Sequence, residues 1–261
     1  SVKLLVGFLV MIACDAQRQS YTIGAWMPGT PENMLSTLRP LLETFLNEQV
    51  GSKQDPPISF GLVPVDYFEN ASSYDMINDN KLDFLYTLAG RISCTLVEHG
   101  WAVIATRRVR INGIESGADA SVVYSLKSRT DIQNISDLAN KKIGVGFILS
   151  ATSYQSGFQL LAENGVHLLK DVDQVVFYSN DFERQFRDVM SGRLDAGFVS
   201  STWLADLHPE VAGLVRVHRE LHPGYEGERF PFPASTPLIP QYGLAASPQA
   251  PWRLKRAVAA A

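Results

Sequence analysis

The feature that most constrains the fold is a regular alternation of short apolar runs with helical patterns. Runs typical of β-strands occur at residues 21–26, 58–63, 82–86, 102–106, 121–124, 142–146, 174–178 and 194–199. Helical spacing fills most gaps, as at residues 135–140, 153–164 and 182–191. An earlier helix is expected to start with Thr30 as its N-cap and Pro31 at its first position, and to kink or restart at Pro40. This alternation predicts an α/β fold with mostly parallel sheets.

Two segments of the chain repeat one another weakly. Residues 74–87 and 186–200 each contain a helical stretch, a tight turn with a basic residue, a Leu-Asp pair, and an apolar strand that ends in a hydroxyl residue. A repeated unit predicts two similarly built lobes with a cleft between them, which is a preferred place for a small-molecule site. A chain of 261 residues has the length for two such lobes or for one large α/β unit.

The first twenty residues have the composition of a secretory signal peptide. Lys3 precedes an apolar run over residues 4–13, which is shorter than the roughly twenty residues that span a bilayer. The alternative is a buried strand or helix at the start of the domain. The stretch that ends at Cys14 also resembles a lipoprotein cleavage box, which would make Cys14 a lipid-modified N-terminus. We therefore expect a secreted or periplasmic location, or the outer face of a membrane, and a chain that is a fragment of a longer protein.

Charge and motif content exclude several classes of function. The net charge is −4, and the densest basic cluster, Arg107-Arg108-Val109-Arg110, is predicted to be a solvated strand end, so nucleic acid is not an expected partner. The sequence contains no nucleophile elbow, phosphate-cradling loop or dinucleotide fingerprint, and its histidines lack metal-ligand spacing. Cys94 is predicted to lie in the core rather than to act as a nucleophile. We expect no catalytic residues, no metal, no cofactor and no enzymatic activity.

Hydroxyl residues gather where predicted strands end, which is where open α/β sheets bind ligands. The richest segment, residues 150–157, places four hydroxyl residues at the start of a helix, where they can serve an oxyanion or can simply cap the helix. A second group follows the strand at residues 194–199. The predicted ligand-binding residues are Thr87, Ser150, Thr152, Ser153, Ser201 and Thr202, with Trp26, Tyr86 and Tyr154 as walls of the site.

Three stretches resemble the phosphonate-binding branch of type II periplasmic binding proteins, and most closely the sensory domain of tetrathionate-type sensor histidine kinases. They are the run KLDFLYTLAG at residues 81–90, the run ISDLANKKIGV at residues 135–145, and Phe230-Pro231-Phe232 with Ser235-Thr236 and Pro240. The resemblance extends from residue 21 to residue 261 and implies a two-lobed fold with a ligand cleft between the lobes.

The resemblance also implies how the chain is divided and which further residues lie at the site. Residues 21–120 would form lobe 1, residues 121–210 lobe 2, and residues 211–261 a return to lobe 1, with crossings near residues 117–125 and 203–217. Ser235 and Thr236 would lie near the cleft as ligand residues. Leu88-Ala89 departs from the usual Asn-Pro of the family, and residues 239–242 depart from its Tyr-Pro-Glu-Trp segment.

These observations predict a solute-binding or sensory domain that closes its lobes on a small anion, such as an oxyanion, a phosphonate or a sulfur oxyanion. The signal would pass to a fused or associated signalling protein, such as a kinase or cyclase module in the same chain, and the full-length protein would be membrane-associated. The alternative is a freestanding lipoprotein that delivers solute to an ABC permease. Two further hypotheses remain: the chain is an enzyme on the same fold, or it is a pair of lobes that binds no solute and mediates protein contacts. The amphipathic helix expected at residues 252–261 would continue toward a membrane helix.

Overall fold

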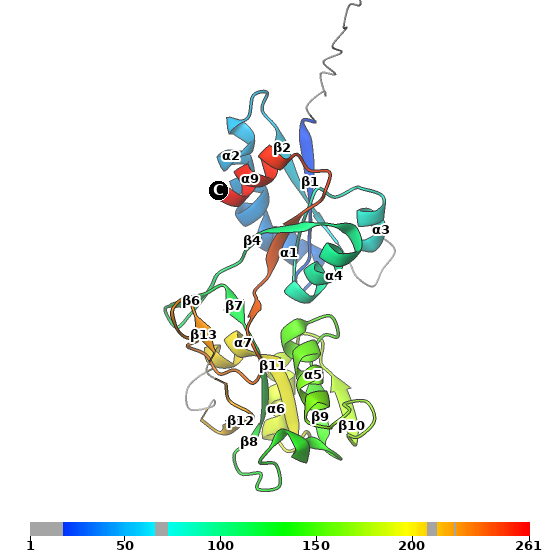
Figure 1. Ribbon diagram of the computed structural model, residues 1–261, viewed down its shortest axis with the longest axis vertical. Coiled ribbons are helices and arrows are strands. Elements are labelled where there is room, and N and C mark those ends of the chain that lie inside the picture. Colours follow the sequence, from blue (N-terminus) through cyan, green and yellow to red (C-terminus); the bar gives the residue numbers. More distant parts are fainter. Residues whose placement is uncertain (1–17, 66–72, 208–212, 222) are drawn as a thin grey trace, which may run out of the picture.

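A computed structural model describes residues 18–65, 73–207, 213–221 and 223–261. The chain forms two lobes, each built on a five-stranded sheet, joined by extended segments between them (Figure 1). Cys14 and most of the predicted signal peptide lie outside the described residues. Ser20, the last residue of that predicted peptide, is already the first residue of strand β1.

The sheet of lobe 1 has the strand order β2-β1-β3-β16-β4. Its strands are β1 (Ser20–Ala25), β2 (Ser59–Pro64), β3 (Phe84–Thr87), β4 (Ala102–Thr106) and β16 (Gly243–Ala246). Strands β1, β2 and β3 are parallel, whereas β16 runs antiparallel to both β3 and β4. Its helices are α1 (Pro31–Arg39), the π-helical turn η1 (Pro40–Thr44), α2 (Phe45–Gln49), η2 (Gly51–Lys53), α3 (Ser73–Asn78), α4 (Ala89–His99) and α9 (Trp252–Ala260).

The start of α1 forms as the sequence predicts. The Thr30 hydroxyl accepts the N–H of Asn33 at 3.3 Å, and Pro31 needs no partner for a missing N–H. The α-helix α1 ends at Arg39 and the π-helical turn η1 begins at Pro40, so a new helical segment starts at the position that the sequence predicts.

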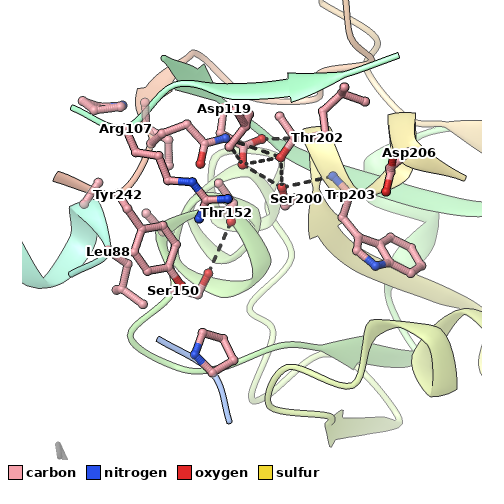
Figure 2. A pocket seen from close by; sticks show the side chains of 18 of the residues that line it. Leu88, Arg107, Asp119, Ser150, Thr152, Ser200, Thr202, Trp203, Asp206 and Tyr242 are labelled. Carbon is pink, nitrogen blue, oxygen red and sulfur yellow. Dashed lines mark hydrogen bonds between the residues drawn. The ribbon is translucent and has the colours of Figure 1, made fainter. Parts of the chain in front are cut away.

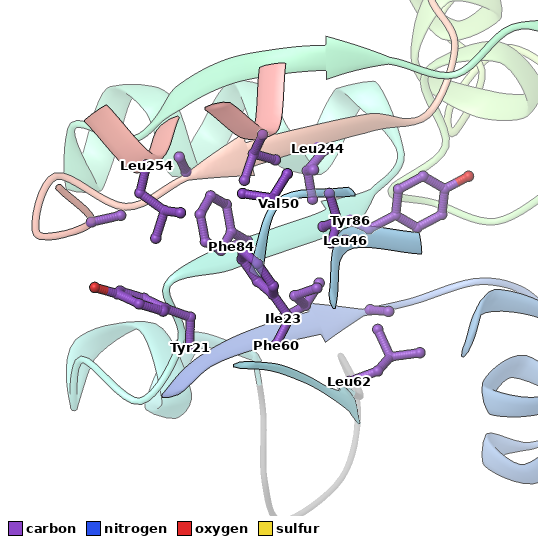
Figure 3. Packing of buried hydrophobic residues seen from close by; sticks show 14 of the residues in the cluster. Tyr21, Ile23, Leu46, Val50, Phe60, Leu62, Phe84, Tyr86, Leu244 and Leu254 are labelled. Carbon is purple, nitrogen blue, oxygen red and sulfur yellow. The ribbon is translucent and has the colours of Figure 1, made fainter. Parts of the chain in front are cut away.

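The core of lobe 1 lies between the sheet and the helices α1, α2 and α9 (Figure 3). Ile23 and Phe84 are fully buried, and the ring of Phe60 lies 5.9 Å from that of Phe84. Leu254 and Val258 place one face of α9 against this cluster. Because the last helix completes the first core, both ends of the described chain belong to lobe 1.

The sheet of lobe 2 has the order β10-β9-β11-β8-β12. Its strands are β8 (Ser121–Leu126), β9 (Lys142–Val145), β10 (Gln174–Phe177), β11 (Ala196–Ser200) and β12 (Val215–Val217). Strands β9, β10 and β11 are parallel, and β8 is antiparallel to β11 and β12. Its helices are η3 (Ile135–Leu138), η4 (Ala151–Gln155), α5 (Ser156–Glu163), α6 (Phe182–Met190) and α7 (Ser201–Asp206).

The two sheets share one plan. Each has three parallel strands followed by an antiparallel strand, β16 in lobe 1 and β8 in lobe 2, that enters from the connection between the lobes. The repeated segments of the sequence lead into β3 and β11, which occupy the same place in the two sheets. The predicted fold of two similar α/β lobes is therefore confirmed.

The connection between the lobes is a short antiparallel pair of strands, β7 (Ala118–Asp119) and β15 (Ile239–Pro240). The first crossing was expected near residues 117–125, in agreement with β7. The second was expected near residues 203–217, with lobe 1 resuming at residue 211, but the chain recrosses only at β15. The reason is that β12 hydrogen-bonds to β8 and so completes the edge of the second sheet.

The pair of strands β7 and β15 is called the hinge from here on. The segments beside the hinge form two small hairpins and one apolar cluster. The hairpins are β5 (Val109–Ile111) with β6 (Ile114–Ser116), and β13 (Gly224–Tyr225) with β14 (Glu228–Arg229). Phe230 and Phe232 lie in edge-to-face contact and pack with Ala118 and Ala120. The Phe-Pro-Phe segment of the sequence is thus part of the hinge region.

Two further observations concern the surface of lobe 1. Cys94 is exposed, so its predicted burial is wrong. The helix α4 buries Arg91, Ile92 and Thr95, and this periodicity turns Cys94 toward solvent. Within the described part of the chain, every helix is too short or too polar to cross a membrane.

Candidate ligand-binding site

A cavity of about 550 Å³ lies between the lobes, where strands of both sheets end. It receives residues that follow β1, β3, β9 and β11, as well as residues of both hinge segments. Its lining includes Pro28, Leu88, Ala89, Arg107, Asp119, Ser150, Thr152, Asn180, Ser200, Thr202, Trp203, Asp206, Gln241 and Tyr242. The predicted position of a cleft at the carboxyl ends of the strands agrees with this cavity.

Two helix N-termini face the cavity from opposite lobes. Leu88 and Ala89 belong to the start of α4 in lobe 1, and Leu88, as N-cap, supplies no side-chain cap. Ser150 and Thr152 belong to the start of η4, which continues into α5 in lobe 2. Unpaired N–H groups give a helix N-terminus a partial positive charge, so both ends favour an anion between them.

Arg107 extends into the cavity from the end of β4 (Figure 2). Its backbone N–H donates to the carbonyl of Tyr242 at 2.7 Å, and its guanidinium lies 5.7 Å from the centre of the Tyr242 ring. Among the described residues Arg107 forms no ion pair, whereas Arg108 pairs with Glu226 at 2.6 Å and Arg110 pairs with Glu115. Arg107 is therefore the cation of this cluster whose charge is left for a ligand.

Asp119 is the buried centre of a hydrogen-bond network at the hinge (Figure 2). Its Oδ1 accepts the backbone N–H groups of Ala120 at 2.8 Å and Thr202 at 3.2 Å. Its Oδ2 accepts the hydroxyls of Ser200 at 2.6 Å and Thr202 at 3.0 Å, and the side-chain amide of Gln241 at 3.1 Å. Five donors from both crossings and from lobe 2 thus converge on one carboxylate.

This network decides which groups can donate to a ligand. Burial raises the pKa of Asp119, and the hydrogen bonds from Ser200, Ala120 and Thr202 act against that rise. Because the hydroxyls of Ser200 and Thr202 point their protons at Asp119, they offer lone pairs rather than protons to the cavity. The Ser150 hydroxyl accepts the N–H of Ser153 at 3.1 Å and keeps its own proton for a neighbour or a ligand. Donors for an anion are therefore on the side of Ser150, Thr152 and Arg107.

The structure brings three of the sequence-predicted ligand residues to the cavity: Ser150, Thr152 and Thr202. The others lie elsewhere. Thr87 and Ser153 are fully buried, and Tyr154 lies in the core of lobe 2 with its ring stacked on Phe158 and Phe177. The Trp26 ring stacks on Phe147.

Tyr86 belongs to the wall between this cavity and a second one. Its ring stacks on that of Tyr242, which lines the interlobe cavity, while Tyr86 itself lines a cavity of about 430 Å³ within lobe 1. Burial raises the pKa of Tyr86, and the positive charge of Arg107 opposes the rise.

The remaining predicted hydroxyls have backbone partners. Ser235 and Thr236 accept the N–H groups of Val123 and Ser121, both at 3.0 Å, and so tie the returning segment to β8. Ser201 donates to the carbonyl of Pro233 at 2.5 Å. These three side chains hold the hinge region to lobe 2.

Sequence reasoning missed Arg107, Asp119 and Gln241 as lining residues. The arginines of the basic cluster are exposed, as the interpretation of a solvated strand end predicts. That interpretation did not predict that Arg107 lines the cavity. The strand-end rule, applied to residues 102–106, would have found Arg107. Asp119 and Gln241 carry no such signal, because only the pairing of β7 with β15 brings them together.

Comparison with known proteins identifies the family. A family model described as the periplasmic substrate-binding protein of phosphonate ABC transporters matches residues 25–261. The chain belongs to this family. A comparison with curated proteins finds no match.

Solved structures similar to this member of the phosphonate-binding family share its fold. A binding-protein component of an ABC phosphonate transporter from Pseudomonas aeruginosa has 17% identity and a TM-score of 0.60, over 92% of this chain and 72% of that one. PhnD1 from Prochlorococcus marinus, in complex with methylphosphonate, has 18% identity and a TM-score of 0.60, over 93% and 83%. XAC2383 from Xanthomonas citri, bound to ATP, has 12% identity and a TM-score of 0.65, over 93% and 82%.

Membership of this family confirms the predicted resemblance to phosphonate-binding proteins and the expected solute-binding class. Proteins of this family act outside the cytoplasm, and they bind substrate for transport. The family description therefore favours the importer alternative over the sensory domain that the sequence led us to expect.

Proposed function

We propose that the protein captures a small oxyanion in the interlobe cavity and delivers it to an ABC permease. The observation that carries the proposal is the meeting of three positive groups from both lobes: the starts of α4 and η4, and the guanidinium of Arg107. An anion between them is stabilised by lobe 1 and lobe 2 together, which couples binding to closure of the cleft.

The chemistry of the lining supports an oxyanion with a small substituent. Ser150 and Thr152 lie beside a helix N-terminus with their hydroxyls 3.3 Å apart, and they can donate to two oxygens of one headgroup when a ligand replaces the hydrogen bond between them. Methylphosphonate, the compound bound to the Prochlorococcus marinus neighbour, combines such a headgroup with a single methyl group and is a suitable first probe.

The test is calorimetric titration with methylphosphonate, phosphate, sulfate and methanesulfonate. Arg107→Gln should weaken binding of the oxyanion that binds best about 10- to 100-fold, because a hydrogen bond to a charged group contributes about 1.5–3 kcal/mol. Arg187→Gln is the matched control, since Arg187 lies on α6 outside the cavity and its side chain is 67% exposed. Equal binding by wild type and Arg107→Gln, or no binding of any oxyanion by wild type, would refute the proposal.

A further inference from the structure

The two lobes contact one another through an aromatic pair. Trp26 directly follows β1 of lobe 1, and Phe147 follows β9 of lobe 2. Their ring centres lie 5.4 Å apart at an interplanar angle of 18°, which is a stacked arrangement. Because the partners belong to different lobes, this contact exists only when the lobes are close together.

Gly90, the second residue of α4 in lobe 1, makes a closer contact with lobe 2. A Cβ at this position would lie 2.7 Å from Oε1 of Gln155, 2.9 Å from the carbonyl oxygen of Leu149 and 3.5 Å from the amide nitrogen of Ala151. The Gln155 side chain could move aside. The Leu149 carbonyl is backbone, so it can withdraw only if its loop or the whole lobe moves.

The segment that Gly90 and Trp26 touch is the one that carries the proposed donors. Phe147, Leu149 and Ala151, which contact lobe 1, belong to the same short stretch of lobe 2 as Ser150 and Thr152. Ser150 and Thr152 line the cavity. The distance between α4 and this loop therefore determines how near the donors of lobe 2 come to Arg107 and the start of α4.

We propose that Gly90 and the Trp26–Phe147 pair form a closing latch, in which Gly90 is a positioning residue that sets how far the lobes approach. This inference rests on the proposed function for its link to affinity, but the latch itself is a property of the two lobes. The absence of a side chain at position 90 admits the loop, and the aromatic stack holds it. A larger residue at position 90 keeps the cleft open without touching the ligand.

The first test is small-angle X-ray scattering of Gly90→Leu, with Gly61→Leu as the matched control. Leu favours a helix more than Gly does, so α4 itself is not weakened. Gly61 lies in β2 of the same lobe, and a Cβ there meets nothing within 4 Å. We expect a larger radius of gyration for Gly90→Leu than for wild type and Gly61→Leu, both free and with methylphosphonate. An unchanged radius for Gly90→Leu in both conditions would overturn the latch.

The second test is a double-mutant cycle on methylphosphonate affinity with Trp26→Leu and Phe147→Leu. If the stacked pair stabilises only the closed state, each substitution lowers the fraction of protein that is closed. The apparent Kd then rises by the same factor as that fraction falls. We expect each single variant to bind at least threefold more weakly, and the double variant to be no weaker than the weaker single one. Fully multiplicative losses would contradict a direct contact. If wild type binds no oxyanion, the proposed function fails, and the scattering of the free proteins still decides the latch.

Discussion

Replacing Asp119 tests the buried hydrogen-bond network of the hinge. In Asp119→Ala the N–H groups of Ala120 and Thr202 lose their acceptor, and the amide of Gln241 keeps only its longer contact of 3.4 Å with the Thr202 hydroxyl. The hydroxyls of Ser200 and Thr202 lie 2.8 Å apart and can bond to each other, so they add little to the cost.

The magnitude follows from the number of groups left without a partner. Each unsatisfied buried donor costs about 1–3 kcal/mol, and removal of a buried charge returns part of that cost. We expect a net loss of about 3 kcal/mol for Asp119→Ala, which is a fall in Tm of about 6–12 °C for a chain of this size. Asp119→Asn keeps one acceptor oxygen, and the hydroxyls can turn to accept from its amide, so about 1 kcal/mol is expected.

Thermal unfolding monitored by circular dichroism measures both variants. Asp79→Ala is the control, because Asp79 is exposed and pairs with the exposed Lys81, so the Tm of this variant should stay near that of wild type. If Asp119→Ala unfolds at the temperature of Asp79→Ala, the carboxylate does not organise the hinge and the reasoning from its five donors is wrong.

Two further predictions concern lobe 2. Burial lowers the pKa of His218 to about 4, so the unfolded state binds a proton first as the pH falls from 6.5. Wild type should lose up to about 3 kcal/mol of unfolding free energy between pH 6.5 and 4 relative to His218→Gln, measured by urea unfolding; parallel pH profiles would contradict this. Gly157→Ala places a Cβ 2.6 Å from the ring of Phe198 and should destabilise by about 1–2 kcal/mol despite better helix propensity, whereas Gly61→Ala should be near neutral in the same assay.

The fold was predictable because its signals are local and repeated. All eight predicted strands are present within a few residues of their expected bounds, and Thr30 caps α1 as its side chain predicts. The pattern of a strand and the cap of a helix each depend on residues that are neighbours in the sequence, so they can be recognised from a single sequence. The repeat is recognised because the same local pattern occurs twice. The predicted position of the second crossing was wrong because the sequence of β12 does not show which of the two sheets this strand pairs with.

The site was harder to predict because a hydroxyl has the same local pattern whether it binds a ligand or the protein. Ser150, Ser201 and Ser235 all lie near strand or helix ends, yet only Ser150 lines the cavity, and the other two bind backbone groups. Their partners are 32 or more positions away in the sequence, so no spacing rule reveals them. Arg107, in contrast, directly follows a predicted strand, so the rule that ligands bind at the carboxyl ends of strands could have identified it.

The geometry also separates what closes the cleft from what holds it closed. The starts of α4 and η4 each carry a partial positive charge of about half a unit, and they face the same cavity from opposite lobes. The start of η4 in lobe 2 and the positive groups of lobe 1, which are Arg107 and the start of α4, repel one another across the cavity, and the stack of Trp26 on Phe147 opposes this repulsion. An anion replaces that repulsion by attraction to both lobes, and this attraction adds to the stabilisation that the uncharged stack of Trp26 on Phe147 gives to the closed arrangement. The charge of the solute would then strengthen the closure, and the shape of lobe 1 at Gly90 would set how far the lobes approach.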